Sequence, residues 1–261
     1  MPRQPRLHLP ETIFHVTARG VERRPIYVTD EDKRYFVSHL VGSLRAHGCG
    51  LVAYCLMPNH FHALVATGAS PLGFPMHDLL TAYAVRFNAG NARDGHLFQS
   101  RFYSHPVQNL SYLQNALVYL HANPVRARLA SSVAGWAWSS HQEWASSSSG
   151  LIDFARLEEL VDIPVRVLRE AYLERVAVMS EGGPKSMSLE DLLADTASEF
   201  GLLADALRDG HRGGASALAR GTFIERASAA RYSVTAIAEI LGCTRAAVCM
   251  ARKRRSCGTA R

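Results

Sequence analysis

Short segments rich in β-branched and aromatic residues alternate with amphipathic helical segments along the first half of the chain. Thr12–Arg19 has the composition of a strand and is followed by Gly20, whereas Asp30–Ala46 carries apolar residues at helical spacing. The same criteria predict strands at Gly50–Met57 and Phe61–Ala66, helices at Pro71–Asn88 and Leu110–Ala122, and an extended segment at His96–Val107. This order predicts an α+β fold in which helices pack on one face of an antiparallel sheet.

Charge divides the 261 residues into three parts. Residues 1–150 contain 13 Lys and Arg against 8 Asp and Glu, residues 151–210 contain 6 against 13, and residues 211–261 contain 10 against 2. Two basic ends around an acidic middle favour a nucleic-acid partner, although an arginine-rich proteome would give the same excess. Because Ser146–Gly150 has linker composition, we expect a first domain at 1–146, acidic connecting helices at 147–210 and a basic region at 211–261.

Several protein classes are excluded by composition. Apolar residues make up 48% of the chain, which is enough for one or two packed cores. No apolar run reaches the roughly 18 residues of a membrane span, and the N-terminal segment lacks the apolar stretch of a secretory signal. The 5 cysteines are scattered without a C-x-x-C pair, which argues against a disulfide framework or a zinc site. We therefore expect a cytoplasmic protein with no membrane partner.

The tripeptide His60-Phe61-His62 is the first candidate for chemistry. Residues i and i+2 of a strand point to the same face, so the two imidazoles lie side by side and can hold a divalent metal from one edge. Two unrelated surface histidines would have the same spacing. The preceding Pro58-Asn59 favours the metal interpretation, because a kink there would fix how the pair is presented. A hydrolytic metal site also needs further ligands and open positions for substrate.

The segment Tyr119–Val125 is the second candidate. On a helix Tyr119 and Asn123 are i and i+4, so a hydroxyl nucleophile lies one turn from an amide that can bind a metal. The alternative is that Tyr119 packs in the core and that Asn123, standing before Pro124, ends the helix. Tyr112 and Tyr103 are other candidate nucleophiles, but neither has an amide or a carboxylate four residues later.

Five blocks of the sequence, in order, resemble the REP-associated tyrosine transposases, which belong to the single-tyrosine, IS200-like transposases with a His-hydrophobic-His motif. The blocks are Phe14–Gly20 with Arg23–Tyr27, Met57–His62, Gly95–Phe102, Tyr119–Ala127 and Trp138–His141, and together they cover residues 12–144. Family members often have Ile where Leu120 stands and commonly Gly at Ser100. Neither departure touches a proposed catalytic atom.

The resemblance implies a ferredoxin-like fold and a metal-dependent DNA strand transferase. His60, His62 and Asn123 would be the ligands of Mg²⁺ or Mn²⁺, and Tyr119 would be the nucleophile that forms a 5′-phosphotyrosine bond and releases a 3′-hydroxyl. The substrate would be single-stranded DNA near imperfect palindromic hairpins, recognised with a short 5′ guide tetranucleotide. The proton acceptor for Tyr119 is left open, because His121 faces elsewhere on the helix.

Basic side chains near these motifs are candidates for phosphate contacts. Each of them is equally well explained as a solvated surface charge. In the first domain these candidates are Arg19, Arg23, Arg24, Arg101 and Arg126.

The last 50 residues predict an all-α region with a helix-turn-helix. Ser233 is a good N-cap for a helix that stops at Gly242, and Thr244 caps a second helix from Arg245 to about Arg254. The second helix of such a motif enters the major groove. The segment weakly resembles the C-terminal helix-turn-helix of bacterial replication initiators, and a helical hairpin with a basic tail is the alternative. The candidate contacts to duplex DNA are Arg245, Arg252, Lys253 and Arg254.

Three functions therefore compete at the level of sequence. The first is a nucleoid-associated transposase that cleaves and rejoins single-stranded DNA through Tyr119. The second is a non-catalytic, sequence-specific DNA-binding or hairpin-binding protein, and the third is a rolling-circle replication initiator. The block Trp138–His141 and the context of Tyr119 favour a transposase over an initiator. The oligomeric state is left open.

Overall fold

The computed structural model describes residues 9–146, 150–181, 189–200, 202, 204–208, 214–229 and 232–256. The chain divides into two compact units, Met1–Glu181 and Gly182–Arg261. The first unit contains a sheet, and the described part of the second is helical.

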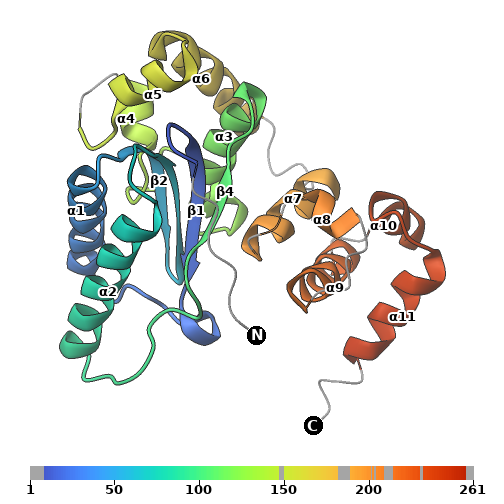
Figure 1. Cartoon of the computed structure of the whole chain (residues 1–261). Coiled ribbons are helices and arrows are strands. Elements are labelled where there is room, and N and C mark those ends of the chain that lie inside the picture. Colours follow the sequence, from blue (N-terminus) through green and yellow to red (C-terminus); the bar gives the residue numbers. More distant parts are fainter. Residues whose placement is uncertain are drawn as a thin grey trace. The chain divides into compact units, whose positions relative to one another are not determined.

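The sheet of the first unit has four strands in the order β2-β3-β1-β4. All three neighbouring pairs are antiparallel. The strands are β1 (Ile13–Arg19), β2 (Gly50–Met57), β3 (His60–Ala66) and β4 (Tyr103–Pro106). Helix α1 (Asp30–Ala46) connects β1 to β2, and α2 (Gly73–Gly90) connects β3 to β4 (Figure 1). This βαββαβ order with this strand order is the ferredoxin-like arrangement, which confirms the predicted α+β fold.

Helices cover both faces of this sheet, which corrects the expectation of a single covered face. Helices α1 and α2 lie on one face of the sheet (Figure 1). The side chains beneath them include Phe14 and Phe61. The other face, which includes Leu64, is covered by α3 (Leu110–Arg126), α5 (Phe154–Val161) and α6 (Val165–Glu181). The reason is visible in β2, in which every residue is buried, and in β3, which is buried on both faces after His60.

The first unit extends beyond residue 146 because the next helices complete its core. Trp144 in α4 (His141–Ser146) is fully buried, and its Nε1 donates to the Val52 carbonyl of β2 at 3.0 Å. Leu157, Leu168 and Tyr172 of α5 and α6 pack into the same cluster. The helices at 154–181 are therefore part of the first compact unit rather than a separate connector.

The second unit is helical throughout its described residues, as predicted. Its helices are α7 (Leu189–Glu199), α8 (Ala204–Arg208), α9 (Gly214–Ala229), α10 (Val234–Ile240) and α11 (Arg245–Ser256). They enclose a separate core that includes Leu193, Phe223, Ile237, Leu241 and Val248. Each unit therefore has its own apolar interior.

Among the described residues no single helix has the length and apolar character needed to cross a membrane. Helix α10 and residues Arg245–Ala251 of α11 form a bent pair. Taken together, these two helices have the length and composition of a membrane span. Ile237 and Val248 of this pair are fully buried in the core of the second unit.

Candidate active site

One face of β1 and β3 carries a row of polar side chains. Cross-strand partners in an antiparallel sheet share a face, and here Thr17 lies opposite His62 and Arg19 opposite His60. Strand β4 pairs with the other edge of β1, and there His105 lies opposite His15. The polar side chains that share this face are His15, Thr17, Arg19, His60, His62, Tyr103 and His105.

His60 is held in one tautomer by Asn59. The amide nitrogen of Asn59 donates to the Arg23 carbonyl at 3.0 Å, so its Oδ1 faces His60 Nδ1, 2.7 Å away. An amide oxygen only accepts, so Nδ1 of His60 is the donor in this contact and carries the proton. Nε2 of a neutral His60 then presents a lone pair, which is the form of imidazole that binds a metal.

His62 is buried and contacts a second histidine, His15. The Nε2 atom of His15 lies 3.0 Å from Nδ1 of His62. Burial lowers the pKa of His15 to about 4, with His105 adding to the effect. Burial also lowers the pKa of His62 well below its usual value, with further contributions from His60, His15 and Arg19. Both rings are therefore neutral at neutral pH. If Nδ1 of His62 donates to His15, Nε2 of His62 becomes the nitrogen able to bind a metal.

Helix α3 brings Tyr119 to these histidines. The Tyr119 ring centroid lies 5.9 Å from that of His62 and 6.4 Å from that of His15. Asn123, one turn later and buried, donates its amide nitrogen to the Tyr119 carbonyl at 3.3 Å. This contact leaves the amide oxygen as the atom of Asn123 that can bind a cation. The structure thus places the predicted nucleophile next to one of the predicted ligands.

The donor set fits a divalent cation. His60 and His62 stand side by side, with ring centroids 5.0 Å apart. Within the described part of the chain, no group of three or more His, Cys, Asp or Glu side chains is arranged to hold a metal ion. The third ligand expected from the sequence is the Asn123 amide oxygen, one helical turn after Tyr119 on α3. Two neutral imidazoles and one amide oxygen are ligands that divalent first-row metals accept, and they leave positions for substrate oxygens.

Three of the predicted basic residues lie at this site. The Arg126 guanidinium stacks over the Tyr119 ring, with Cζ 4.8 Å from the ring centroid. Arg19 is the cross-strand partner of His60, and the Arg23 carbonyl holds Asn59.

The other predicted basic residues lie elsewhere. Arg24 is exposed and pairs with Glu22 at 2.7 Å, and Arg101 is exposed just before β4. In the second unit Arg245 is exposed at the start of α11. The side chains of Arg252, Lys253 and Arg254 lie outside the described residues.

The loop that carries Arg23 and Arg24 depends on Gly20. A Cβ at Gly20 would lie 2.2 Å from the Arg24 carbonyl oxygen, so a larger residue would push this turn open. The backbone of Gly20 also donates to the Asn59 carbonyl at 2.8 Å. The turn therefore connects the end of β1 to the residue that orients His60.

Sequence reasoning assigned no role to His15 or to Asn59. The alternation His15-Val16-Thr17-Ala18-Arg19 does predict three polar side chains on one face. Which strand those side chains would meet depends on the pairing register, and no local pattern fixes it. For Asn59 the sequence suggested a kink, whereas the structure shows a hydrogen bond to His60.

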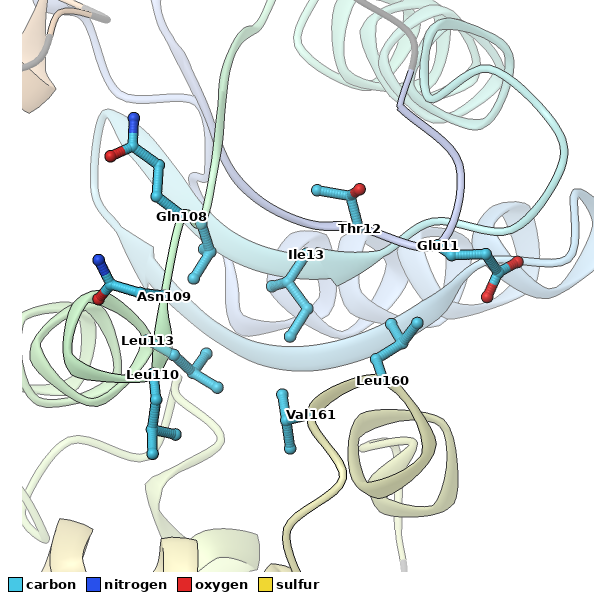
Figure 2. Close-up of a pocket in the computed structure, with 10 residues that line it drawn as sticks. Glu11, Thr12, Ile13, Gln108, Asn109, Leu110, Leu113, Leu160 and Val161 are labelled. Atoms are coloured by element: carbon cyan, nitrogen blue, oxygen red, sulfur yellow. The ribbon is translucent and has the colours of Figure 1, made fainter.

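A cavity of about 260 Å³ lies away from this constellation (Figure 2). Ile13, Leu113 and Val161 converge on it, with Gln108 and Asn109 at its edge. None of the residues predicted for catalysis or metal binding lines it. Ile13 and Arg19 are the two ends of β1, so the cavity is about 20 Å along the strand from the Arg19 end. The candidate site is the largely buried polar face of β1 and β3 rather than this cavity.

We expect His15→Leu to weaken metal binding without removing any ligand. The substitution leaves His62 Nδ1 without its buried partner, so the His62 ring is no longer held in the metal-binding tautomer. Second-shell changes of this kind typically lower metal affinity about 10- to 100-fold. Titration with Mn²⁺ followed by calorimetry measures the change. His15→Gln, which restores a hydrogen-bonding group, should recover part of the affinity, and equal affinities of His15→Leu and the unaltered protein would contradict this role.

A second, fully buried polar cluster fastens α3 to the sheet. His121 Nε2 lies 2.8 Å from Ser140 Oγ, and Ser140 Oγ accepts from the Tyr54 amide of β2 at 2.9 Å. His141 Nδ1 lies 2.6 Å from the Tyr172 hydroxyl of α6. The block Trp138–His141 thus connects β2, α3 and α6, and His121 serves this connection rather than the proton of Tyr119.

We expect His121 to make folding sensitive to acid. Burial, followed by the nearby His141, lowers the pKa of His121 to about 3, against about 6.5 in an unfolded chain. The stability that the neutral ring contributes is present above pH 6.5 and is lost as pH falls toward 3, because only the unfolded state binds the proton. Between pH 6.5 and 3 the unfolded state binds up to one proton more than the folded state at this position. His121→Gln removes that difference, so the slope of the unfolding free energy against pH should fall by up to about 1.4 kcal/mol per pH unit. Urea unfolding at several pH values tests this, and identical slopes would contradict it.

Part of the first unit matches a known protein family. A family model described as "Transposase IS200 like" matches residues 9–123, which hold both histidines of the pair, Tyr119 and Asn123. No curated protein matches the chain. A solved structure described as "Structure of the REP associates tyrosine transposase bound to a REP hairpin" is similar with a TM-score of 0.45 and 18% identity, over 60% of this chain and 96% of that chain. Residues 9–123 therefore form a transposase domain of the IS200-like family.

Proposed function

We propose that this protein cleaves and rejoins single-stranded DNA near hairpins, with Tyr119 as the nucleophile and a divalent metal at His60, His62 and Asn123. The observation that carries the proposal is the position of Tyr119, whose ring lies 5.9 Å from the buried His62 on the polar face of the sheet. A phenol beside a pair of metal-competent imidazoles supports nucleophilic attack on a phosphodiester.

Tyr119 forms the new covalent bond. Its hydroxyl oxygen attacks the phosphorus, the bond from phosphorus to the 3′-oxygen breaks, and the DNA 5′-phosphate becomes linked to tyrosine. The proton lost by the phenol is balanced by the proton that the departing 3′-oxygen gains. Because the phosphodiester energy is conserved in the tyrosine ester, a 3′-hydroxyl can attack it later and rejoin DNA without ATP.

The residues around Tyr119 orient the two imidazoles and place positive charge near the nucleophile. The Arg126 guanidinium lies over the Tyr119 ring and brings a positive charge close to the nucleophile. Asn59 and His15 hold the two imidazoles in place through their Nδ1 atoms. A bound Mg²⁺ or Mn²⁺ would polarise the scissile phosphate and offset its developing charge.

The proposed substrate is single-stranded DNA that carries hairpins. Arg126 lies over the Tyr119 ring and Arg19 pairs across the strands with His60, so positive charge is available for one phosphate chain while the bases stay free for recognition. The similar solved structure was bound to a REP hairpin. We extend that substrate class to this chain because its blocks of sequence resemble the same transposases. Action on chromosomal hairpins would make the protein a cytoplasmic, nucleoid-associated one.

A covalent-trapping experiment tests the proposal. The full-length protein is mixed with a panel of hairpin-bearing single strands, labelled at either end, with Mn²⁺, Mg²⁺ or EDTA. We expect an SDS-resistant adduct only with 3′-labelled strands, together with a shortened 5′-labelled product, and neither product in EDTA. An adduct on 5′-labelled strands would contradict the proposed polarity. Tight hairpin binding without cleavage in either metal would favour the non-catalytic DNA-binding function instead.

A further inference from the structure

Helices α10 and α11 of the second unit have the geometry of a helix-turn-helix. The bend between them is 106°, and each helix begins at a side-chain cap, with Ser233 bonded to the Ala236 amide and Thr244 to the Ala247 amide. Gly242 in the turn has a φ of +58°, a conformation that favours glycine. A sharp three- to four-residue turn with glycine is typical of this motif.

The turn is fixed from a third helix. Arg220 of α9 donates to the Leu241 carbonyl at 3.4 Å and also bonds the Leu207 carbonyl at the end of α8. Ile237 and Leu241 on one side of the turn and Val248 on the other are fully buried. The angle between the two helices is therefore determined by packing rather than by the turn alone.

The opposite side of α11 is exposed among the described residues of the second unit. Arg245, Ala246, Cys249 and Met250 are all exposed there, and Met250 is 55% exposed despite being apolar. We call these four residues the outer face of α11. They fall on one side of the helix because their spacing is i, i+1, i+4 and i+5.

Charge identifies what this face would contact. Residues 211–261 contain 10 Lys and Arg and only 2 acidic residues, Glu225 and Glu239, which lie in α9 and α10. Helix α11 itself contains no acidic residue, and Arg252, Lys253 and Arg254 follow the outer face along the chain. A cationic helix with an exposed side of small and apolar residues is complementary to a DNA groove rather than to an ordinary protein surface.

We propose that α11 is a recognition helix that enters the major groove of duplex DNA and selects a base sequence through its outer face. Arg245 donates to the N7 and O6 acceptors of a guanine, and Ala246 and Met250 contact thymine methyl groups. Arg252, Lys253 and Arg254 contact phosphates. This site is separate from the single-strand site at Tyr119, and it does not depend on strand cleavage.

Selection from a library of duplexes with a randomised central segment tests the proposal. The full-length protein is used in EDTA, so that the metal site takes no part. We expect enrichment of a defined sequence, and an affinity for it that Arg245→Ala lowers about 10- to 100-fold with relaxed preference at one base pair. Arg245→Lys, which keeps the charge but loses the bidentate fork, should relax the same base pair. Replacing Arg252, Lys253 and Arg254 by Gln should weaken all duplexes alike and flatten the salt dependence.

Matched controls separate this proposal from the proposed catalytic function. Arg166→Ala removes one exposed positive charge from α6 of the first unit and should leave the selected affinity unchanged. Tyr119→Phe should likewise bind the selected duplex as tightly as the unaltered protein. No enrichment of any sequence, or equal losses in Arg245→Ala and Arg166→Ala, would overturn the proposal whatever the outcome of the cleavage assay.

Cys249 supplies an independent measurement on the outer face. It is exposed, whereas Cys49 and Cys55 are buried, so a maleimide should modify it readily. We expect the selected duplex to slow the modification of Cys249 by at least about tenfold, with each cysteine resolved by peptide mass spectrometry. A labelling rate that the selected duplex does not change would show that the outer face is not the surface in contact, and would overturn the assignment.

Discussion

Tyr119→Phe is expected to abolish the covalent adduct with single-stranded DNA. The substitution removes only the hydroxyl oxygen, so the ring contacts with His62 and Arg126 can remain. Without that oxygen no phosphotyrosine can form at this position, and loss of a nucleophile typically lowers turnover by at least about 10³-fold. Denaturing gels with 3′-labelled hairpin strands measure the adduct, and anisotropy with the same strands shows whether binding persists.

Tyr112 provides the matched control for this experiment. It lies seven residues before Tyr119 on the same helix, and burial raises the pKa of its hydroxyl. Tyr112→Phe therefore removes a similar group from α3, at a position where Tyr112 packs against the apolar cluster on this side of the sheet. We expect this variant to form the adduct at the normal rate. An adduct that survives in Tyr119→Phe but is lost in Tyr112→Phe or Tyr103→Phe would move the nucleophile and contradict the proposed site.

Local sequence pattern predicted most elements of the first unit but not all of their ends. The helix Asp30–Ala46 and the strand Gly50–Met57 have the predicted bounds, because a capping box at Thr29 and a continuous apolar run define them. Helix α3, predicted to stop at Ala122, continues through Pro124 to Arg126. Its last turn persists because the Asn123 and Pro124 carbonyls still accept amides from Ala127 and Leu129.

The parts of the candidate site that could be predicted are the pairs of residues that lie on a single strand or helix. The i, i+2 spacing of His60 and His62 and the i, i+4 spacing of Tyr119 and Asn123 follow from strand and helix geometry. The contact between His15 and His62 joins residues 47 positions apart, and it exists only once β1 pairs with β3 in one register. A register is set by the packing of the whole sheet, so no local pattern could predict that contact.

The second covered face of the sheet was missed for a related reason. This face is covered by α3, α5 and α6, and α5 and α6 lie beyond the predicted boundary at residue 146. Leu168 and Tyr172 were assigned to an acidic connector. The overall charge of an amphipathic helix comes from its exposed side, so it does not show that the other side packs in a core. Only their packing against Trp144 and Leu117 shows that these helices belong to the first unit.

His62→Ala is expected to remove metal-dependent cleavage while leaving the nucleophile in place. The variant retains His60 and Asn123 but loses the imidazole that lies beside Tyr119. Two of the three proposed protein ligands then remain, which is too few to hold the metal tightly. We expect Mn²⁺ affinity to fall by more than about 100-fold, which exceeds the effect of a second-shell change. Calorimetric titration with Mn²⁺ alone gives a measurement that does not depend on DNA or on turnover.

Two further variants keep this prediction falsifiable if His62→Ala is unstable. The substitution leaves the buried His15 Nε2 without its partner, which costs about 1–3 kcal/mol of stability. His62→Gln fills more of the space and offers a hydrogen-bonding group to His15, yet it still removes the imidazole ligand. His77→Ala removes an exposed imidazole from α2 and should change neither Mn²⁺ affinity nor cleavage. If His62→Gln folds and binds Mn²⁺ as tightly as His77→Ala, the metal lies elsewhere and the proposed ligand set is wrong.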